Sequence, residues 1–196
     1  MSNQTMLTEI DGPMLAEAFP AECLPAAVIA GTEVAQRLML RQWTDRFAVH
    51  IGFQSVLIPS RLNFSPDQLI MVETEEVRRF VRALETRSND GFERQRAARD
   101  LLVTMEPWGA PFILSLVGEY VIEILEDIAS AITPENEQIL GTFITQNEAY
   151  WNTIRRRVAS YWNVYYRSYP RTKYVGFELV KRLEAAASVC AETSSK

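Results

Sequence analysis

Residues 112–132, FILSLVGEYVIEILEDIASAI, carry the clearest helical pattern in this chain of 196 residues. Apolar side chains recur there at the three- and four-residue spacing of one helix face, and acidic side chains occupy the opposite face. We therefore predict an amphipathic helix over 112–132. Its apolar face comprises Ile113, Val117, Tyr120, Val121, Ile124, Ile128 and Ile132, and its polar face comprises Glu119, Glu123, Glu126, Asp127 and Ser130.

A second helix start follows directly. Residues 133–135, Thr-Pro-Glu, supply a capping hydroxyl, a proline for the first helical position and an acid for the first turn. Apolar and aromatic residues then recur at helical spacing until Pro170, which predicts one helix of about 35 residues with a kink near Gly141 or Ser160. We expect a last helix over 174–190.

Upstream of this region the pattern is again mostly helical. A capping box at 65–68, Ser-Pro-Asp-Gln, predicts a helix that runs to about residue 88, and a turn then leads into a helix over 92–105. An apolar stripe over 33–51 predicts a further helix, capped by Thr32. The β-branched and apolar cluster near 55–58 predicts a short strand or an extended linker.

These elements predict an all-α fold of about six helices, arranged as an orthogonal bundle or as a short helical-repeat-like stack. Residues 1–31 contain prolines and glycines without a sustained period, so we expect an extended or loosely helical N-terminal arm that is peripheral. We expect residues 32–190 to form a single helical domain and residues 191–196 to form a frayed tail.

Composition sets the broad class of the protein. A chain that is 47% hydrophobic and 23% charged has the composition of one globular domain. The longest stretch without a charged residue, 47–60, is shorter than the roughly 18 residues that span a bilayer, so we expect no membrane helix. Because no Lys or Arg precedes Arg37, a secretory leader is not indicated. We expect a cytoplasmic protein in which Cys23 and Cys190 are free thiols.

Charge is distributed unevenly along the chain. Residues 1–148 hold 11 Arg and Lys against 22 Asp and Glu, whereas residues 149–196 hold 9 against 3. The stretch 101–154 has eight acidic residues and no basic one, and Arg155, Arg156 and Arg157 follow it. This asymmetry indicates either a surface for a charged partner or acidic and basic segments that pair inside one fold. The sequence leaves both interpretations open.

No motif of catalysis or metal binding stands out. Glu119, Glu123 and Glu126 lie along one helix face opposite the apolar stripe, which is typical of a solvated face and not of a di-iron site. His50 is the one histidine, and with Cys23 it forms no recognisable nucleophile motif. Phosphate-binding glycine motifs are absent from the sequence. We predict no catalytic residue, metal or cofactor, although an enzyme with a pocket built from several helices stays open.

The segment 150–174 interleaves aromatic residues with arginines. This combination suits a protein interface, single-stranded nucleic acid or, at its inward positions, the core. Helical geometry turns Arg156 and Tyr166 away from the buried stripe and leaves Trp162 at its edge, so there are more aromatic residues than one buried face needs. Together with Arg167, these residues are our candidates for a contact surface in this segment.

The function predicted from these features is that of a non-enzymatic helical protein-interaction module. An inhibitor or immunity-type protein is one such role, in which Glu119, Glu123, Glu126 and Asp127 would meet a basic partner. Single-stranded nucleic-acid binding through the C-terminal segment is the first alternative, and an isoelectric point near 5.1 weighs against it. An enzyme is the second alternative, and a homo-oligomer also stays open.

Overall fold

We analysed a computed structural model in which residues 10–39, 42, 44–65 and 74–194 are described. In these residues the chain forms nine α-helices and one two-stranded sheet, so the predicted helical class is confirmed, with more helices than the six expected. The helices are α1 (Gly12–Ala16), α2 (Leu24–Arg37), α3 (Glu75–Glu85), α4 (Gly91–Val103), α5 (Ala110–Val117), α6 (Ile122–Ala131), α7 (Pro134–Gln146), α8 (Glu148–Tyr165) and α9 (Val175–Ser194); the strands are β1 (Arg46–Ile51) and β2 (Gln54–Pro59).

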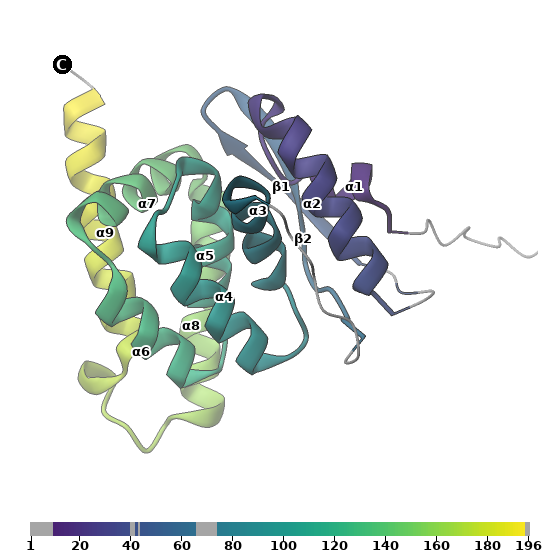
Figure 1. Cartoon of the computed structure of the whole chain (residues 1–196). Helices are drawn as coiled ribbons and strands as arrows, with labels where there is room; N and C mark the ends of the chain where they lie inside the picture. Colours follow the sequence, from purple (N-terminus) through teal and green to yellow (C-terminus); the bar gives the residue numbers. More distant parts are fainter. Residues whose placement is uncertain (1–9, 40–41, 43, 66–73, 195–196) are drawn as a thin grey trace, which may run out of the picture.

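The elements form two neighbouring groups. Figure 1 shows α1, α2 and the β1–β2 hairpin on one side of the molecule and α4 to α9 on the other, with α3 between them. Helix α3 packs against both α2 and α4, and α9 packs along α7 and α6. One cluster of buried apolar side chains runs through both groups, from Ile10 to Leu183. No helix within the described residues is both long enough and apolar enough to cross a membrane.

Residues 10–31 belong to this core, which corrects the predicted peripheral arm. Leu15 and Phe19 are 1% and 3% exposed, and Phe19 contacts the rings of Phe80, Trp108 and Phe112. Helices α1 and α2 approach closely because Gly12 and Gly31 face one another. A side chain on either glycine would collide with the other helix, since no room is left for a Cβ atom. Residues 1–9 of the predicted arm lie outside the described residues.

The predicted helix over 33–51 is wrong beyond Arg37, and Thr32 does not cap it, because α2 already begins at Leu24 and Thr32 lies inside it. Helix α2 ends at Arg37, and 46–51 forms β1, which pairs antiparallel with β2 from Arg46 opposite Pro59 to Ile51 opposite Gln54. Burial along β1 alternates with the two-residue period of a strand. The predicted strand near 55–58 lies within β2. Gly52, with a φ of +60°, forms the tight turn between the two strands.

Helices α3 and α4 follow the prediction with shifted ends. Thr74 caps α3 by accepting a hydrogen bond from the N–H of Val77, and Asp90 caps α4. Of the predicted capping box, 66–68 lies outside the described residues. The last helix, α9, continues to Ser194, so residues 191–194 of the predicted frayed tail are helical.

Two predicted long helices are each divided. The helix over 112–132 is interrupted between α5 and α6, where Gly118 ends α5 and Glu119 turns into the interior. The helix of about 35 residues breaks between α7 and α8 at Asn147, and not at Gly141 or Ser160. At each break a polar side chain, Glu119 or Asn147, contacts residues from a distant part of the chain.

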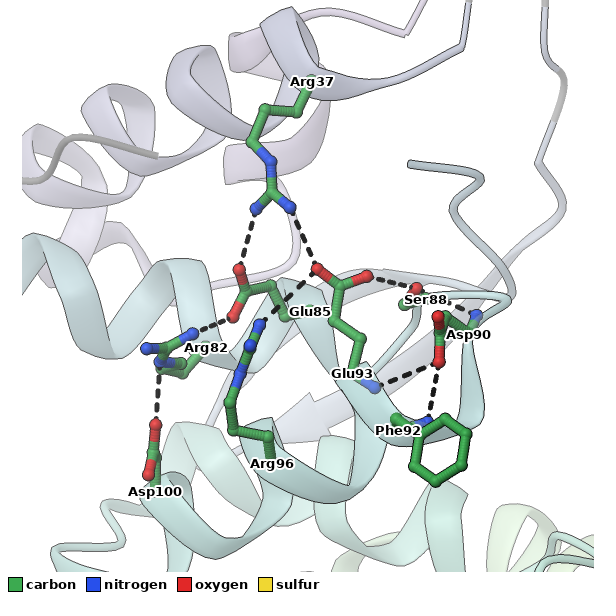
Figure 2. Close-up of polar contacts among 9 residues, drawn as sticks. All are labelled: Arg37, Arg82, Glu85, Ser88, Asp90, Phe92, Glu93, Arg96 and Asp100. Carbon is green, nitrogen blue, oxygen red and sulfur yellow. Dashed lines mark hydrogen bonds and ion pairs between the residues drawn. The ribbon is translucent and has the colours of Figure 1, made fainter. Parts of the chain in front are cut away.

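A network of charged side chains fastens α2 to α3 and α4 (Figure 2). Arg37 reaches Glu85 at 2.9 Å and Glu93 at 3.0 Å, and Ser88 donates to the second oxygen of Glu93 at 2.6 Å. Glu85 is 2% exposed. Arg82 extends the network from Glu85 to Asp100, and Arg96 lies 3.9 Å from Glu93. Three arginines thus face three carboxylates, so the charges in this network balance.

Candidate interaction surface

Five tyrosines gather at the end of α8 and are linked by ring contacts between neighbours. The buried face of α8 begins with Trp151, Ile154 and Val158. Its next positions, Tyr161 and Tyr165, lie beyond the edge of the core, so the same helix face passes from buried to exposed. We call this group the tyrosine surface; it comprises Tyr120, Tyr161, Tyr165, Tyr166 and Tyr169.

Three members of the tyrosine surface are about half exposed. The exposed fractions are 48% for Tyr120, 59% for Tyr165 and 51% for Tyr169, and the adjacent Val164 is 63% exposed. Apolar side chains scattered singly over a surface are ordinary, whereas a contiguous group marks a place of contact. Tyr120 comes from the turn between α5 and α6, so the surface joins two segments that are distant in sequence.

Two half-buried side chains, Tyr166 of the tyrosine surface and the neighbouring Trp162, hold the surface in place. The Tyr166 hydroxyl donates to the backbone oxygen of Tyr120 at 2.5 Å, and the Trp162 indole N–H donates to the backbone oxygen of Tyr169 at 3.1 Å. The Arg171 guanidinium lies over the Trp162 ring, 5.1 Å from its centroid. Two sequence candidates, Trp162 and Tyr166, therefore position the surface and are only partly exposed themselves.

Arginines without ion pairs border this region. Arg156, Arg157 and Arg167 are exposed, and no carboxylate of the described residues lies within ion-pair distance of them. Arg155 differs, because it contacts Glu184 at 3.1 Å. The sequence candidates Arg156 and Arg167 are thus available to an outside partner.

The four acidic candidates divide into two kinds. Glu119 is 4% exposed, so its predicted place on a solvated face is wrong: the chain turns at Gly118 and directs the carboxylate toward Arg94 and Arg61. Asp127 lies on α6, but Arg99 holds it at 2.7 Å.

Glu123 and Glu126 are exposed, and no ion pair engages them within the described part of the chain. Both lie on α6, which begins two residues after Tyr120. Burial raises the pKa of Tyr166, and the negative charges of Glu123 and Glu126 raise it further. Among the described residues one ion pair, between Arg182 and Glu137, joins the basic segment 149–196 to the acidic remainder of the chain. Internal pairing therefore leaves most of the charge asymmetry in place.

One cavity of the described residues has neither histidine nor cysteine in its lining. This cavity, of about 570 Å³, lies between α1 and the hairpin and is lined by Asp11, Glu17, Thr44 and Asp45 among others. In the described residues no group of three or more His, Cys, Asp and Glu side chains could hold a metal ion. Burial raises the pKa of Cys23, and nearby carboxylates raise it further, so this thiol is not an activated nucleophile.

Tyr120, Tyr161, Tyr165 and Tyr169 were not among the sequence candidates. Tyr161 and Tyr165 could have been identified by continuing the apolar stripe of α8 past its last buried residue, Val158. The position of Tyr120 depends on the break after α5, which the sequence pattern does not show. The chain matches no protein-family model, no curated protein and no solved structure.

Proposed function

We propose that this protein is a non-enzymatic protein-interaction module that binds its partner through the tyrosine surface and the adjacent arginines. The observation that carries the proposal is a contiguous group of ring-contacting tyrosines, three of them 48–59% exposed. Tyrosine and arginine, with tryptophan, are enriched at the energetic centres of protein interfaces. Tyrosine buries a large area with few rotatable bonds, and arginine offers a planar fork of hydrogen-bond donors.

Charge favours a protein partner over a nucleic acid. Arg157 and Arg167 would attract phosphates, but Glu123 and Glu126 lie beside the same tyrosines and would repel a continuous polyanion. The chain as a whole carries a net charge of -5. A protein can place acidic groups against the arginines and basic groups against the two glutamates, which a nucleic-acid backbone cannot do.

An inhibitor or immunity-type role toward a basic partner is the finer form of this proposal. Only Glu123 and Glu126 of the four acidic candidates are available for it, because Glu119 is buried and Asp127 is paired. Such a partner would contact these two glutamates and the tyrosines together. Replacing both glutamates by lysine would then slow association, since rim charges act mainly on association rates.

The test compares capture of partners from native cells by the wild-type chain and by the double variant Tyr165→Ala/Tyr169→Ala. A control, Phe92→Ala/Val103→Ala, removes two apolar side chains that are 85% and 81% exposed elsewhere on the molecule. A protein captured by the wild type and the control is then purified, and its affinity for each form is measured by calorimetry. We expect the tyrosine variant to bind about 30-fold more weakly, as for loss of a binding hot spot of about 2 kcal/mol.

Two outcomes would overturn the proposal. One is equal affinity of the tyrosine variant and the control for the captured protein. The other is capture of nucleic acid, recognised by its absorbance at 260 nm and by its release at high salt. That result would favour single-stranded nucleic-acid binding through this surface.

A further inference from the structure

Three arginines from different segments, Arg61, Arg87 and Arg94, lie within 4 Å of one carboxylate, that of Glu119, and a fourth, Arg157, packs its stem beside Gly118. Arg94 Nε lies 2.8 Å from one carboxylate oxygen, and Arg61 Nη2 lies 2.7 Å from the other. Arg87 Nη1 is farther away, at 3.9 Å. Arg157 lies against Gly118, the residue before Glu119. We propose that these four arginines form a binding site for a phosphate group that enters beside Arg61 and Arg157; this site does not depend on the proposed interaction function.

The charges at this site do not balance. Glu119 is the one carboxylate within ion-pair distance of Arg61, Arg87 or Arg94 in the described residues, and no carboxylate there reaches Arg157. The network around Arg37 is the internal comparison, because it opposes three arginines with three carboxylates (Figure 2). A buried charge is normally paired, since unpaired burial costs several kcal/mol. An anion from outside would supply the missing charge.

Hydrogen-bond donors are also left over. Arg87 is 4% exposed and donates through Nε to Pro59 O at 3.0 Å and through Nη2 to Ser60 O at 2.6 Å. Its Nη1 is buried and has no hydrogen-bond acceptor, and the same holds for Nη1 of Arg61. Burial lowers the pKa of Arg87 to about 10; the charge of Glu119 opposes this shift, and the positive charges of Arg61 and Arg94 add to it. An oxyanion would relieve this strain by accepting hydrogen bonds and by offsetting the repulsion.

The site is open to solvent on one side. The side chain of Arg61 is 40% exposed, and Arg157 is exposed as well. Arg157 packs beside Gly118, the residue before Glu119: a Cβ atom added at Gly118 would lie 3.5 Å from Cδ of Arg157. Arg61 and Arg157 can therefore meet an anion from solvent, while Arg87 and Arg94 provide fixed positive charge behind them.

The excess of positive charge specifies the class of ligand. Arg61, Arg87 and Arg94 against Glu119 leave two positive charges, and the unpaired Arg157 adds a third nearby, which suits a phosphate dianion better than a single carboxylate. Guanidinium groups also match the spacing of phosphate oxygens and bind them through paired hydrogen bonds. The phosphate could be inorganic or belong to a phosphomonoester, and both share this chemistry.

The test is calorimetric titration of the full chain with inorganic phosphate, and in a second arm with O-phosphoserine, at constant ionic strength set by chloride. We compare the wild type with Arg61→Gln and Arg157→Gln. The control is Arg156→Gln, which removes the same charge from an exposed neighbouring position that the helix directs elsewhere. We expect saturable binding to the wild type and the control, and at least about tenfold weaker binding to both site variants.

Each outcome decides the proposal. If both ligands bind equally, the phosphate group alone accounts for the affinity. If O-phosphoserine binds more tightly, the natural ligand is a phosphomonoester. Both results support the site. It is overturned if phosphate gives no saturable heat beyond chloride, or if either site variant binds as the control does. Arg157→Gln breaks no ion pair of the described residues, so its folding is not at risk even if Arg61→Gln loosens Glu119.

Discussion

The side-chain amide of Asn147 pairs with the backbone of His50 as a neighbouring strand would. Its Oδ1 accepts a hydrogen bond from the His50 N–H at 2.7 Å, and its Nδ2 donates to the His50 carbonyl at 2.8 Å, across a separation of 97 residues. The amide also donates to Phe143 O at 2.9 Å. This contact covers part of the free edge of β1 and joins the hairpin to the helical bundle at the break between α7 and α8.

Asn147→Ala is expected to lower the free energy of unfolding by about 2–4 kcal/mol. The substitution removes three hydrogen bonds and leaves part-buried backbone groups of His50 and the buried carbonyl of Phe143 without this partner, each with a desolvation cost. Urea unfolding followed by circular dichroism measures the change. Asn152→Ala, at an exposed position of α8, is the matched control and should change stability by less than about 0.5 kcal/mol. Equal stability of the two variants would contradict the bridging role of Asn147.

Gly31→Ala is expected to destabilise the protein strongly, because a Cβ atom at this position would lie 2.4 Å from the backbone oxygen of Gly12. Helix α1 would have to move away from α2, and overpacking of this kind costs about 1–3 kcal/mol. Gly91→Ala is the control: it also lies in a helix, and the nearest atom to its Cβ would be 3.8 Å away. That variant should be unchanged or slightly more stable. Similar stabilities for the two variants would show that α1 is not docked tightly on α2.

Glu119→Gln is expected to cost about 3–5 kcal/mol, because it removes the one carboxylate that faces Arg61, Arg87 and Arg94. Glu123→Gln makes the same chemical change at an exposed position that is four residues away on α6. Surface substitutions of this type are nearly neutral. Thermal unfolding of both variants distinguishes a buried structural carboxylate from a surface one, and comparable melting temperatures would count against the burial of Glu119.

The sequence predicted the helical class because apolar periodicity reflects the shape of each element. It failed where tertiary contacts override local pattern. Nothing in the spacing around Glu119 shows that it turns inward, since its arginine partners come from 61, 87 and 94. Asn147 likewise fits the helical repeat, and its bond to His50 depends on a hairpin that the apolar stripe over 33–51 concealed.

The residues of the tyrosine surface could be identified from the sequence only in part, for a related reason. Composition identified the aromatic and arginine-rich segment, and helical geometry selected Arg156, Trp162 and Tyr166. Which aromatic residues are exposed depends on where the core ends, and this is set by the length of the neighbouring helices. Tyr161 and Tyr165 continue a buried stripe and so resembled core residues, whereas Tyr165 is 59% exposed.

Tyr174→Phe is expected to leave the protein as stable as the wild type near neutral pH, or more stable by about 1 kcal/mol. The Tyr174 ring is 1% exposed and its hydroxyl has no hydrogen-bond partner, so the substitution removes an unsatisfied buried polar group and keeps the packing. Tyr169→Phe, at a position that is 51% exposed, is the control. Urea unfolding near neutral pH measures both, and a clear loss of stability in Tyr174→Phe alone would reveal a partner for the hydroxyl.

The same variant should resist alkaline unfolding. Burial raises the pKa of Tyr174 from 10.0 to about 12, with a further contribution from Tyr166. Between these values the unfolded chain has released the phenolic proton while the folded chain retains it, so the free energy of unfolding falls as pH rises through this window. Phenylalanine has no proton to release, and Tyr174→Phe should lose less stability than the wild type or Tyr169→Phe between pH 9 and about 11. Parallel losses in all three proteins would mean that Tyr174 titrates as an exposed tyrosine does.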